Sequence, residues 1–206
     1  DTRIIRAILD TASPRESRRT TMEFLTSAEA AERTRIILRG SILLWLGALM
    51  AWLIRADAAL LQYFDASPFF GSLRPVFEWY TDWGMFIFYA FFIALLAYGV
   101  RHKRALFKQA GLAYVFAQVF GTFLLVRLVK IGCGRPRPNV ATMHDALCQA
   151  PSLAHAFNSF PSSHATNVAV GAMFVFLLLR SRVAALLALA AALLMALARI
   201  AIGEHY

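Results

Sequence analysis

Three cations stand close together between residues 130 and 138, in the segment Lys-Ile-Gly-Cys-Gly-Arg-Pro-Arg-Pro. They are Lys130, Arg135 and Arg137. Arginine offers a planar fork of N–H donors that matches phosphate oxygens in pairs, and lysine adds a compact positive charge. Proline and glycine stiffen and shape the turn around them. The segment therefore predicts a phosphate-binding loop, with nonspecific attraction to lipid headgroups as the alternative.

A second cluster, Phe-Pro-Ser-Ser-His at residues 160–164, precedes a long apolar run. Pro161 suits the first position of a helix, and the small residues after it leave N–H groups unpaired at the positive end of the helix dipole. Such a helix terminus binds anions readily. His164 would stand beside the anion, where a histidine can donate a proton to a leaving oxygen. The alternative is a histidine at a helix end that is simply exposed to water.

A third cluster ends the last apolar segment and contains Arg199, Gly203, Glu204 and His205. A charged side chain near the membrane interior costs at least ~2.5 kcal/mol, so Arg199 marks a candidate site unless its side chain reaches the membrane surface. On a regular helix, positions 199 and 205 project about 120° apart with a rise of about 9 Å. Both side chains can therefore flank one anion.

The elements that must position these clusters are membrane helices. Hydrophobic residues make up 59% of the 206 residues and charged residues 16%, with a mean hydropathy of +0.58. This composition excludes a water-soluble globule and a disordered chain, and two cysteines are too few for a small disulfide scaffold. The net charge of +9 does not indicate a nucleic-acid partner, because 8 of the 21 basic residues precede residue 40 and most others flank apolar segments.

Five apolar runs approach the roughly 20 residues that a spanning helix needs. They lie at about 36–54, 83–100, 109–126, 162–179 and 183–202. We therefore expect an all-α polytopic bundle at 36–206, preceded by a cytoplasmic arm at 1–35. The aromatic-rich stretch 57–82 is too often interrupted to span and suits the headgroup level or ordinary loop packing.

Basic residues in short loops predict the orientation. The dense clusters at 101–108 and 180–182, together with the arginine-rich amino terminus, belong on the cytoplasmic side. The loops 55–82 and 127–161, and the end of the last helix, then lie outside. All three clusters thus meet on the outer face, although about 25 and 35 residues separate them in sequence.

Taken together, the clusters resemble the signature of the type 2 phosphatidic acid phosphatase superfamily. The matching residues are Lys130 followed after six residues by Arg137-Pro138, then Pro161-Ser162-Ser163-His164, then Arg199 followed after five residues by His205. The resemblance covers residues 83–206. It implies a six-helix membrane phosphatase that hydrolyses lipid phosphates without a metal or other cofactor, through a phosphohistidine intermediate.

The resemblance also implies a role for each matching residue. His205 is the nucleophile and His164 the general acid. Phosphate is bound by Lys130, Arg137, Arg199 and Ser162, and by the backbone amides of Ser163 and His164. We therefore expect removal of phosphate from an amphipathic lipid at the outer face of a bacterial-type inner membrane. Transfer of the phosphoryl group to a lipid acceptor is one alternative, and an anion transporter or lipid-binding membrane protein is another.

The chain departs from the family pattern at three places. It has Ser163 where glycine is usual and Ala198 where serine is usual. The carboxylate expected four residues after His205, which orients the nucleophile, is absent because the sequence stops at Tyr206. We therefore expect a chain that is incomplete at its C-terminus and lacks the sixth helix.

Two further expectations concern metals and cysteines. A magnesium site is disfavoured, because only Asp145 and Glu204 stand near the clusters and the cations would repel a divalent ion. Zinc held by His144 and His155 with His164 or His205 is an alternative without the usual ligand spacing. Cys133 and Cys148 both lie in the expected outer loop, where an oxidising compartment permits a disulfide; two unpaired thiols are the alternative.

Overall fold

The computed structural model describes residues 28–40, 56–138, 140 and 148–205, and its regular elements are helices. Residues 28–40 form one helix. The others are α4 (Ala56–Ala66), α5 (Pro68–Arg101), α6 (Ala105–Phe116), the π-helical segment η1 (Ala117–Leu125), α7 (Val126–Cys133), the short 3-10 helix η2 (His155–Phe157), α8 (Ser163–Leu178) and α9 (Arg182–Ala201). The first expected span, 36–54, lies mostly outside the described residues.

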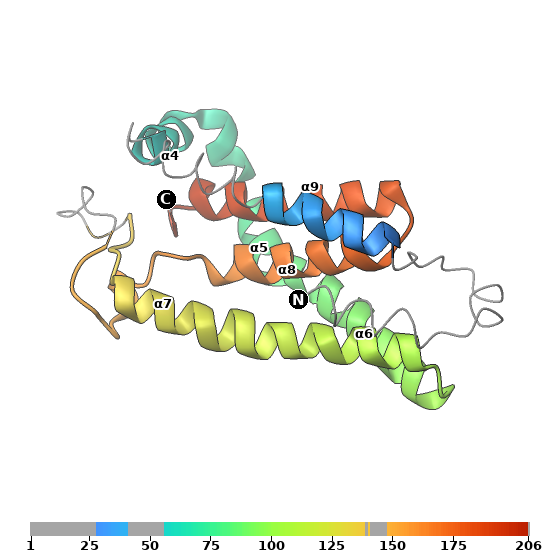
Figure 1. Cartoon of the computed structure of the whole chain (residues 1–206). Helices are drawn as coiled ribbons and strands as arrows, with labels where there is room; N and C mark the ends of the chain where they lie inside the picture. Colours follow the sequence, from blue (N-terminus) through green and yellow to red (C-terminus); the bar gives the residue numbers. More distant parts are fainter. Residues whose placement is uncertain (1–27, 41–55, 139, 141–147, 206) are drawn as a thin grey trace.

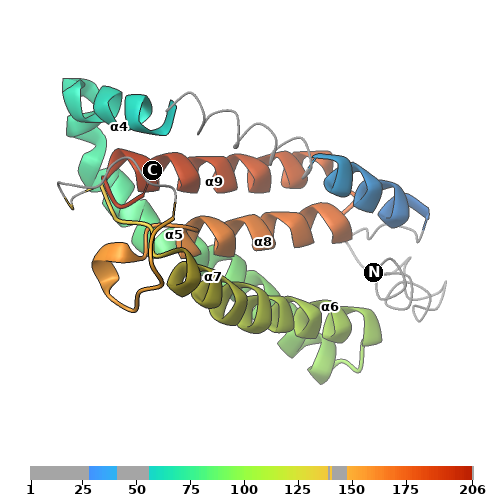
Figure 2. The same cartoon turned by 60° about the vertical axis from the view of Figure 1, so that its left-hand side comes forward.

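The bundle consists of two helical hairpins packed together (Figure 1). A short turn joins α5 to α6, which continues through η1 into α7 as one long rod. The second hairpin is α8 and α9, which lie side by side in both views (Figure 2). Ser181 starts α9, and its hydroxyl oxygen accepts a hydrogen bond from the amide of Ala184 at 3.2 Å. A capping serine of this kind lets α9 begin directly after α8 ends.

The interior where the hairpins meet is packed with large apolar side chains. Phe92, Val168 and Met195 are fully buried, and Tyr114 is nearly so. The rings of Phe92 and Tyr114 stack at a centroid distance of 4.1 Å, and Phe174 contacts both edge-on. This interior joins α5, α6, α8 and α9, so it fixes the ends of these helices relative to one another.

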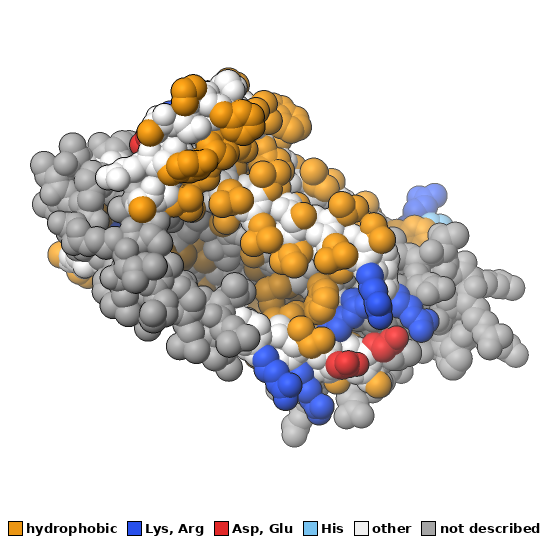
Figure 3. All heavy atoms as spheres, turned by 90° about the horizontal axis from the view of Figure 1, so that it is seen from above, with side chains coloured by type: hydrophobic (Ala, Val, Ile, Leu, Met, Phe, Trp, Pro, Cys, Tyr) orange, Lys and Arg blue, Asp and Glu red, His pale blue; other side chains and the backbone are white. Residues whose placement is uncertain are grey.

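Much of the outer surface is apolar as well. Hydrophobic side chains spread over the face shown in Figure 3, while Lys and Arg gather toward one end. Large residues such as Phe123, Ile87 and Val183 are exposed at 76%, 69% and 67%. A helix with apolar side chains all round suits a lipid surrounding. The bundle is therefore built as a membrane protein.

Three helical stretches are long and apolar enough to cross a membrane: Pro68–Arg101, Ala105–Cys133 and Arg182–Ala201. They contain the second and third expected spans and all of the fifth except its last residue. The fourth expected span corresponds to α8, a shorter apolar helix of 16 residues. The structure thus bears out the all-α class, and the total of five or six spans stays a prediction.

The stretch 57–82, expected as a loop or an interrupted interfacial segment, is helical instead. It forms most of α4 and the first turns of α5. Ser67 separates the two helices, and α5 starts at Pro68 and continues past Pro75. The sequence pattern missed this because tertiary contacts stabilise the helices: α4 packs against α9, and the rings of Phe64 and Phe70 meet edge-on at 4.6 Å. At 1.5 Å per residue, α5 is about 50 Å long against a hydrocarbon core of about 30 Å. Its first turns can therefore still lie at headgroup level.

The helix at 28–40 docks on the end of the bundle where α8 turns into α9. Arg33 donates hydrogen bonds to the carbonyls of Phe176 and Leu179 at 2.6 and 2.9 Å, and its guanidinium lies over the Phe176 ring. Glu29 pairs with Arg180 at 3.5 Å. The end of the expected arm and the basic turn 180–182 therefore lie together, as their common assignment to the cytoplasmic side requires.

Candidate active site

The three sequence clusters meet at one end of the bundle. Figure 1 shows the end of α7, the start of α8 and the end of α9 at the same side, opposite the α5–α6 turn. Polar side chains are buried there to an unusual degree. Lys130, Arg135, Arg137, Asn158, Ser159, Arg199 and His205 all have exposed fractions of 7% or less. Buried charges need partners, so the contacts of each residue decide what this end can do.

The chain leaves α7 through Gly134, which has the left-handed backbone angle φ of 54°. Its amide donates to the carbonyl of Lys130 at 2.9 Å and so closes the last turn of the helix. A side chain at position 134 would press on the carbonyl oxygen of Ala150. Only glycine combines this backbone angle with this close approach, and the turn directs Arg135 and Arg137 inward.

The segment after Gly134 lies against residues 155–159 through backbone hydrogen bonds. The Arg137 amide donates to the carbonyl of Ala156 at 2.8 Å, and the Ser159 amide donates to the carbonyl of Arg135 at 3.0 Å. The side chain of Arg137 adds a bond from Nε to the carbonyl of His155 at 3.2 Å. These bonds fix the guanidinium of Arg137 on the segment that leads into α8.

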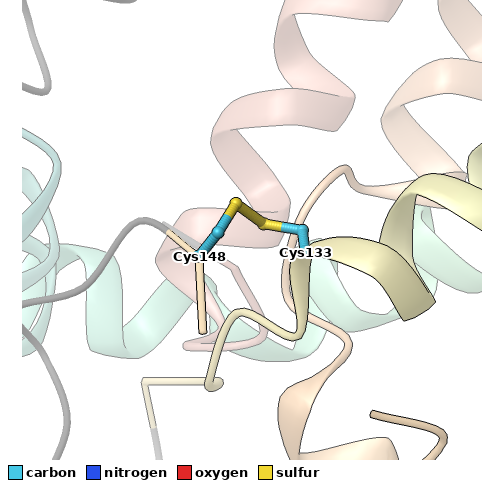
Figure 4. Close-up of a disulfide and its surroundings, with 2 residues drawn as sticks. All are labelled: Cys133 and Cys148. Carbon is cyan, nitrogen blue, oxygen red and sulfur yellow. A yellow bond between two sulfur atoms is a disulfide. The ribbon is translucent and has the colours of Figure 1, made fainter. Parts of the chain in front are cut away.

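A disulfide joins Cys133 to Cys148, with the two Cα atoms 4.6 Å apart (Figure 4). The backbone supports the same connection, because the Gln149 amide donates to the carbonyl of Cys133 at 2.7 Å. The Ser152 amide also donates to the carbonyl of Ile131 at 2.9 Å. The loop after residue 147 is thus attached to the end of α7, next to the arginines.

Lys130 is the cation of the first cluster that lies within α7, whereas the two arginines follow the helix. Its ammonium group donates to the carbonyl of Asn158 at 3.1 Å, and its side chain is buried on the last turn of α7. One hydrogen bond leaves further ammonium donors for another acceptor. Lys130 also interacts electrostatically with Arg137 and Arg199, which places three positive charges around one region.

Pro161, predicted at the first position of a helix, lies before α8 instead, because Ser162 has an extended backbone, caps the helix with its side chain, and α8 begins at Ser163. Ser162 precedes the helix, and its hydroxyl oxygen accepts a long hydrogen bond of 3.5 Å from the amide of Ala165. Ser162 therefore caps the helix, while its own O–H remains able to donate to a ligand. The amides of Ser163 and His164 belong to the first turn, where N–H groups have no acceptor within the helix.

The third cluster lies at the end of α9, where the chain reverses its direction at Gly203. Gly203 has φ of 75°, and the amides of Glu204 and His205 both donate to the carbonyl of Arg199 at 3.2 Å. This is the hydrogen-bond pattern of a glycine-terminated helix end. The turn folds the Glu204 carboxylate back over the arginines: it pairs with Arg137 and lies 3.3 Å from Arg199.

The ring of His205 is buried, and its Nδ1 contacts the backbone carbonyl of Ser159. Because a carbonyl can only accept, Nδ1 carries the hydrogen and Nε2 keeps its lone pair. Burial lowers the pKa of His205 to about 3; the Ser159 bond opposes this shift, and the charges of Arg199, Lys130 and Arg137 add to it. A neutral imidazole with a free Nε2 is the form that can act as a nucleophile.

His164 is half-buried on the first turn of α8 and interacts electrostatically with the same three cations as His205. Asp82 of α5 also acts on His164 and on Arg199, with the opposite sign. The structure therefore brings both predicted histidines into the field of one cation cluster. Such a cluster can bind a phosphate group and stabilise the charge that develops as it is transferred.

The magnesium and zinc alternatives involve residues that the structure describes only in part. Within the described ranges, no three His, Cys, Asp or Glu side chains come together in a way that could hold an ion. His144, one ligand of the zinc alternative, lies outside the described residues. His155 is exposed, and its pKa is lowered first by the charge of Arg137 and then by burial. The charges at this position thus favour an anion.

Several groups at the site could not be identified from the sequence. The carbonyls of Asn158 and Ser159 hold Lys130 and His205, but every residue has a carbonyl, so no residue type signals this role. The amide oxygen of Asn158 and the hydroxyl of Ser159 are buried and form no hydrogen bond within the part of the chain that the structure describes. Asp82 belongs to none of the three sequence clusters, although its charge acts on His164 and Arg199.

The fold and the site together define a polytopic α-helical membrane protein with a buried cationic site at one end. Comparison with known families agrees, because the model of the PAP2 superfamily matches residues 108–206, which contain all three clusters. Over these residues the chain is therefore similar to the PAP2 superfamily.

Two curated relatives are similar over 96 residues. A lipid A 1-phosphatase of Rhizobium johnstonii is 40% identical, and the match covers 46% of this chain and 38% of that protein. A lipid A 1-phosphatase of Rhizobium etli is 38% identical, with 46% and 40% covered. The match thus spans about two fifths of the length of these relatives. No solved structure matches the chain significantly.

Proposed function

We propose that this chain carries the catalytic site of a membrane lipid phosphatase that works through a phosphohistidine. One observation carries the proposal: His205, with Nδ1 held by the Ser159 carbonyl, lies in the field of Lys130, Arg137 and Arg199. The match of residues 108–206 to the PAP2 superfamily supports the same reaction. A cationic pocket beside a neutral histidine suits attack on a phosphate group.

In the proposed reaction, Nε2 of His205 attacks phosphorus and forms a P–N bond while the bond from phosphorus to the lipid oxygen breaks. Protonated His164 gives its proton to that oxygen, so the lipid leaves as an alcohol. Water then loses a proton to His164 and attacks the phosphohistidine. Inorganic phosphate departs and His205 is regenerated. Lys130, Arg137, Arg199, Ser162 and the first amides of α8 hold the phosphate oxygens throughout.

The substrate that we favour is lipid A or another phosphorylated membrane lipid, reached from the outer face of the inner membrane. Support comes from the two rhizobial relatives, which are lipid A 1-phosphatases, and from the long apolar helices at whose ends the candidate site lies. The cationic residues supply the charge stabilisation that a metal ion gives in other phosphatases, so the proposed reaction requires no cofactor.

The test is phosphate release by the intact protein in detergent, with lipid A, phosphatidate, phosphatidylglycerophosphate and a polyprenyl pyrophosphate as substrates. We expect release from at least one lipid, unchanged by EDTA, and a loss of about 10³-fold or more in His205→Ala. The His164→Ala variant should release phosphate slowly from lipids. Its rate should recover with an aryl phosphate, because the leaving oxygen of that substrate needs no proton.

Three results would contradict the proposal. Normal turnover by His205→Ala would show that His205 is not the nucleophile. Activity that is lost in EDTA and restored by magnesium would show that the reaction depends on a metal. Appearance of the phosphoryl group on an added lipid acceptor, with no inorganic phosphate formed, would show a transferase.

A further inference from the structure

Glu204 contacts both guanidinium groups that the proposed function assigns to phosphate. Its Oε2 pairs with Nη1 of Arg137 and accepts a hydrogen bond from Nη2 of Arg199 at 3.3 Å. The two arginine side chains are 8% and 9% exposed, whereas the glutamate side chain is 39% exposed. The carboxylate thus reaches from the water side onto two buried cations.

The backbone determines this reach. Glu204 follows the reversal at Gly203, and its amide is tied to the carbonyl of Arg199, the residue that its side chain also pairs with. The next residue is His205, whose ring is fixed on Ser159. Glu204 therefore has an anchored main chain and a partly exposed side chain, which can leave the arginines for water without disturbing the histidine.

A carboxylate and a phosphate use the same donors of arginine, and one N–H cannot serve both fully. We propose that Glu204 sets the phosphate affinity of this site by competing with the phosphate group for Arg137 and Arg199. The inference rests on the proposed function, which gives these arginines to the substrate. Glu204 then weakens the binding of inorganic phosphate as well, and so promotes release of the product.

A purely supporting role for Glu204 would have the opposite effect. If the carboxylate held the two arginines in position for phosphate, its removal would let the guanidiniums move apart and phosphate would bind more weakly. The direction of the change in phosphate affinity therefore distinguishes competition from support.

The experiment measures binding of inorganic phosphate to the intact protein in detergent by calorimetry, which needs no turnover. In Glu204→Gln, which keeps the size and removes the charge, we expect the dissociation constant to fall roughly three- to tenfold. The same decrease should appear in the inhibition constant of phosphate against lipid hydrolysis. Glu204→Ala serves as a second variant, with the same expected direction.

Glu29→Gln is the matched control. Glu29 is 34% exposed and pairs with Arg180 at 3.5 Å, so its removal breaks a similar pair at the opposite end of the bundle. Phosphate binding should be unchanged in this variant. Unchanged or weaker phosphate binding in both Glu204 variants, with their melting temperatures near that of the wild type, would overturn the proposal.

The outcomes separate this inference from the proposed function. Suppose that phosphate binds more tightly to Glu204→Gln and that the wild type releases no phosphate from any lipid. This result would support competition at the arginines and contradict the proposed phosphatase activity. If the wild type hydrolyses lipids but the Glu204 variants do not bind phosphate more tightly, the proposed phosphatase activity stands and the proposed role of Glu204 is wrong.

Discussion

The side chains of one arginine, one lysine and one histidine of the candidate site are held by backbone carbonyls. Arg137 donates to the carbonyl of His155, Lys130 to that of Asn158, and His205 to that of Ser159. A carbonyl is neutral and accepts without neutralising a cation, so the positive charges stay available for an anion. The segment 155–159 therefore orients the site while leaving its charge intact.

The lowered pKa of His205 predicts that the protein loses stability in acid. In the unfolded chain this imidazole titrates near 6.5, and in the folded protein near 3, mainly because of burial. Protonation below pH 6.5 therefore favours the unfolded state, and stability falls as the pH drops toward 3. At about pH 5 this one group should cost ~2 kcal/mol.

His205→Asn tests this, because asparagine keeps a donor for Ser159 and does not titrate. Between about pH 7.5 and pH 5, the wild type should lose ~2 kcal/mol more stability than the variant, measured by thermal unfolding in one detergent. Equal losses in both proteins would mean that His205 titrates normally in the folded state.

At the scale of elements, two helix ends bring the cations together, and each depends on one glycine. Gly134 turns the chain after α7 toward residues 155–159, and Gly203 turns it after α9 toward Arg137. The disulfide and the Ser152 amide then attach the following loop to α7. The positions of the arginines are thus set by how the helices terminate.

Gly134→Ala should destabilise the protein by at least ~1 kcal/mol, because alanine is strained in the left-handed region. Its Cβ would also press on the carbonyl oxygen of Ala150. Gly132→Ala is the matched control: it lies inside α7 with open space around the new Cβ, and should be neutral or stabilising by up to about 1 kcal/mol. The melting temperatures of the two variants in detergent should move in different directions. A Gly134→Ala protein as stable as Gly132→Ala would show that the turn tolerates a side chain.

At the scale of the whole molecule, the two ends of the bundle differ in character. One end holds the turn 102–104, the basic turn after α8 and the docked helix 28–40, and the other holds the cationic site with the disulfide. Disulfides persist in oxidising compartments, and dense basic turns stay in the cytoplasm. Both arguments support an orientation with the site on the outer face.

Single introduced cysteines should test this orientation. The two native cysteines are joined in the structure, so Ser152→Cys and Arg104→Cys each add one reactive thiol. We expect a membrane-impermeant maleimide to label position 152 in intact cells and position 104 only after permeabilisation. The protein without introduced cysteines is the control. Labelling of position 104 alone in intact cells would reverse the orientation and place the site in the cytoplasm.

The helical class, most of the described spans and the residue types of the candidate site could be predicted without a fold. Runs of apolar residues can be recognised in the sequence alone, because a helix surrounded by lipid requires them along its whole length. The spacing of Lys130, Arg137, His164, Arg199 and His205 was likewise enough to suggest that they act together. In the structure the two histidines lie in the field of the three cations.

How these residues are held depends on contacts between distant parts of the chain. That 57–82 is helical depends on packing against α9 and between aromatic rings, which a local pattern does not contain. That Ser159 orients His205, and that Glu204 spans two arginines, depends on which carbonyl and which carboxylate approach after the helices turn. Backbone acceptors are the same at every residue, so their choice is made by long-range packing and cannot be read from residue types.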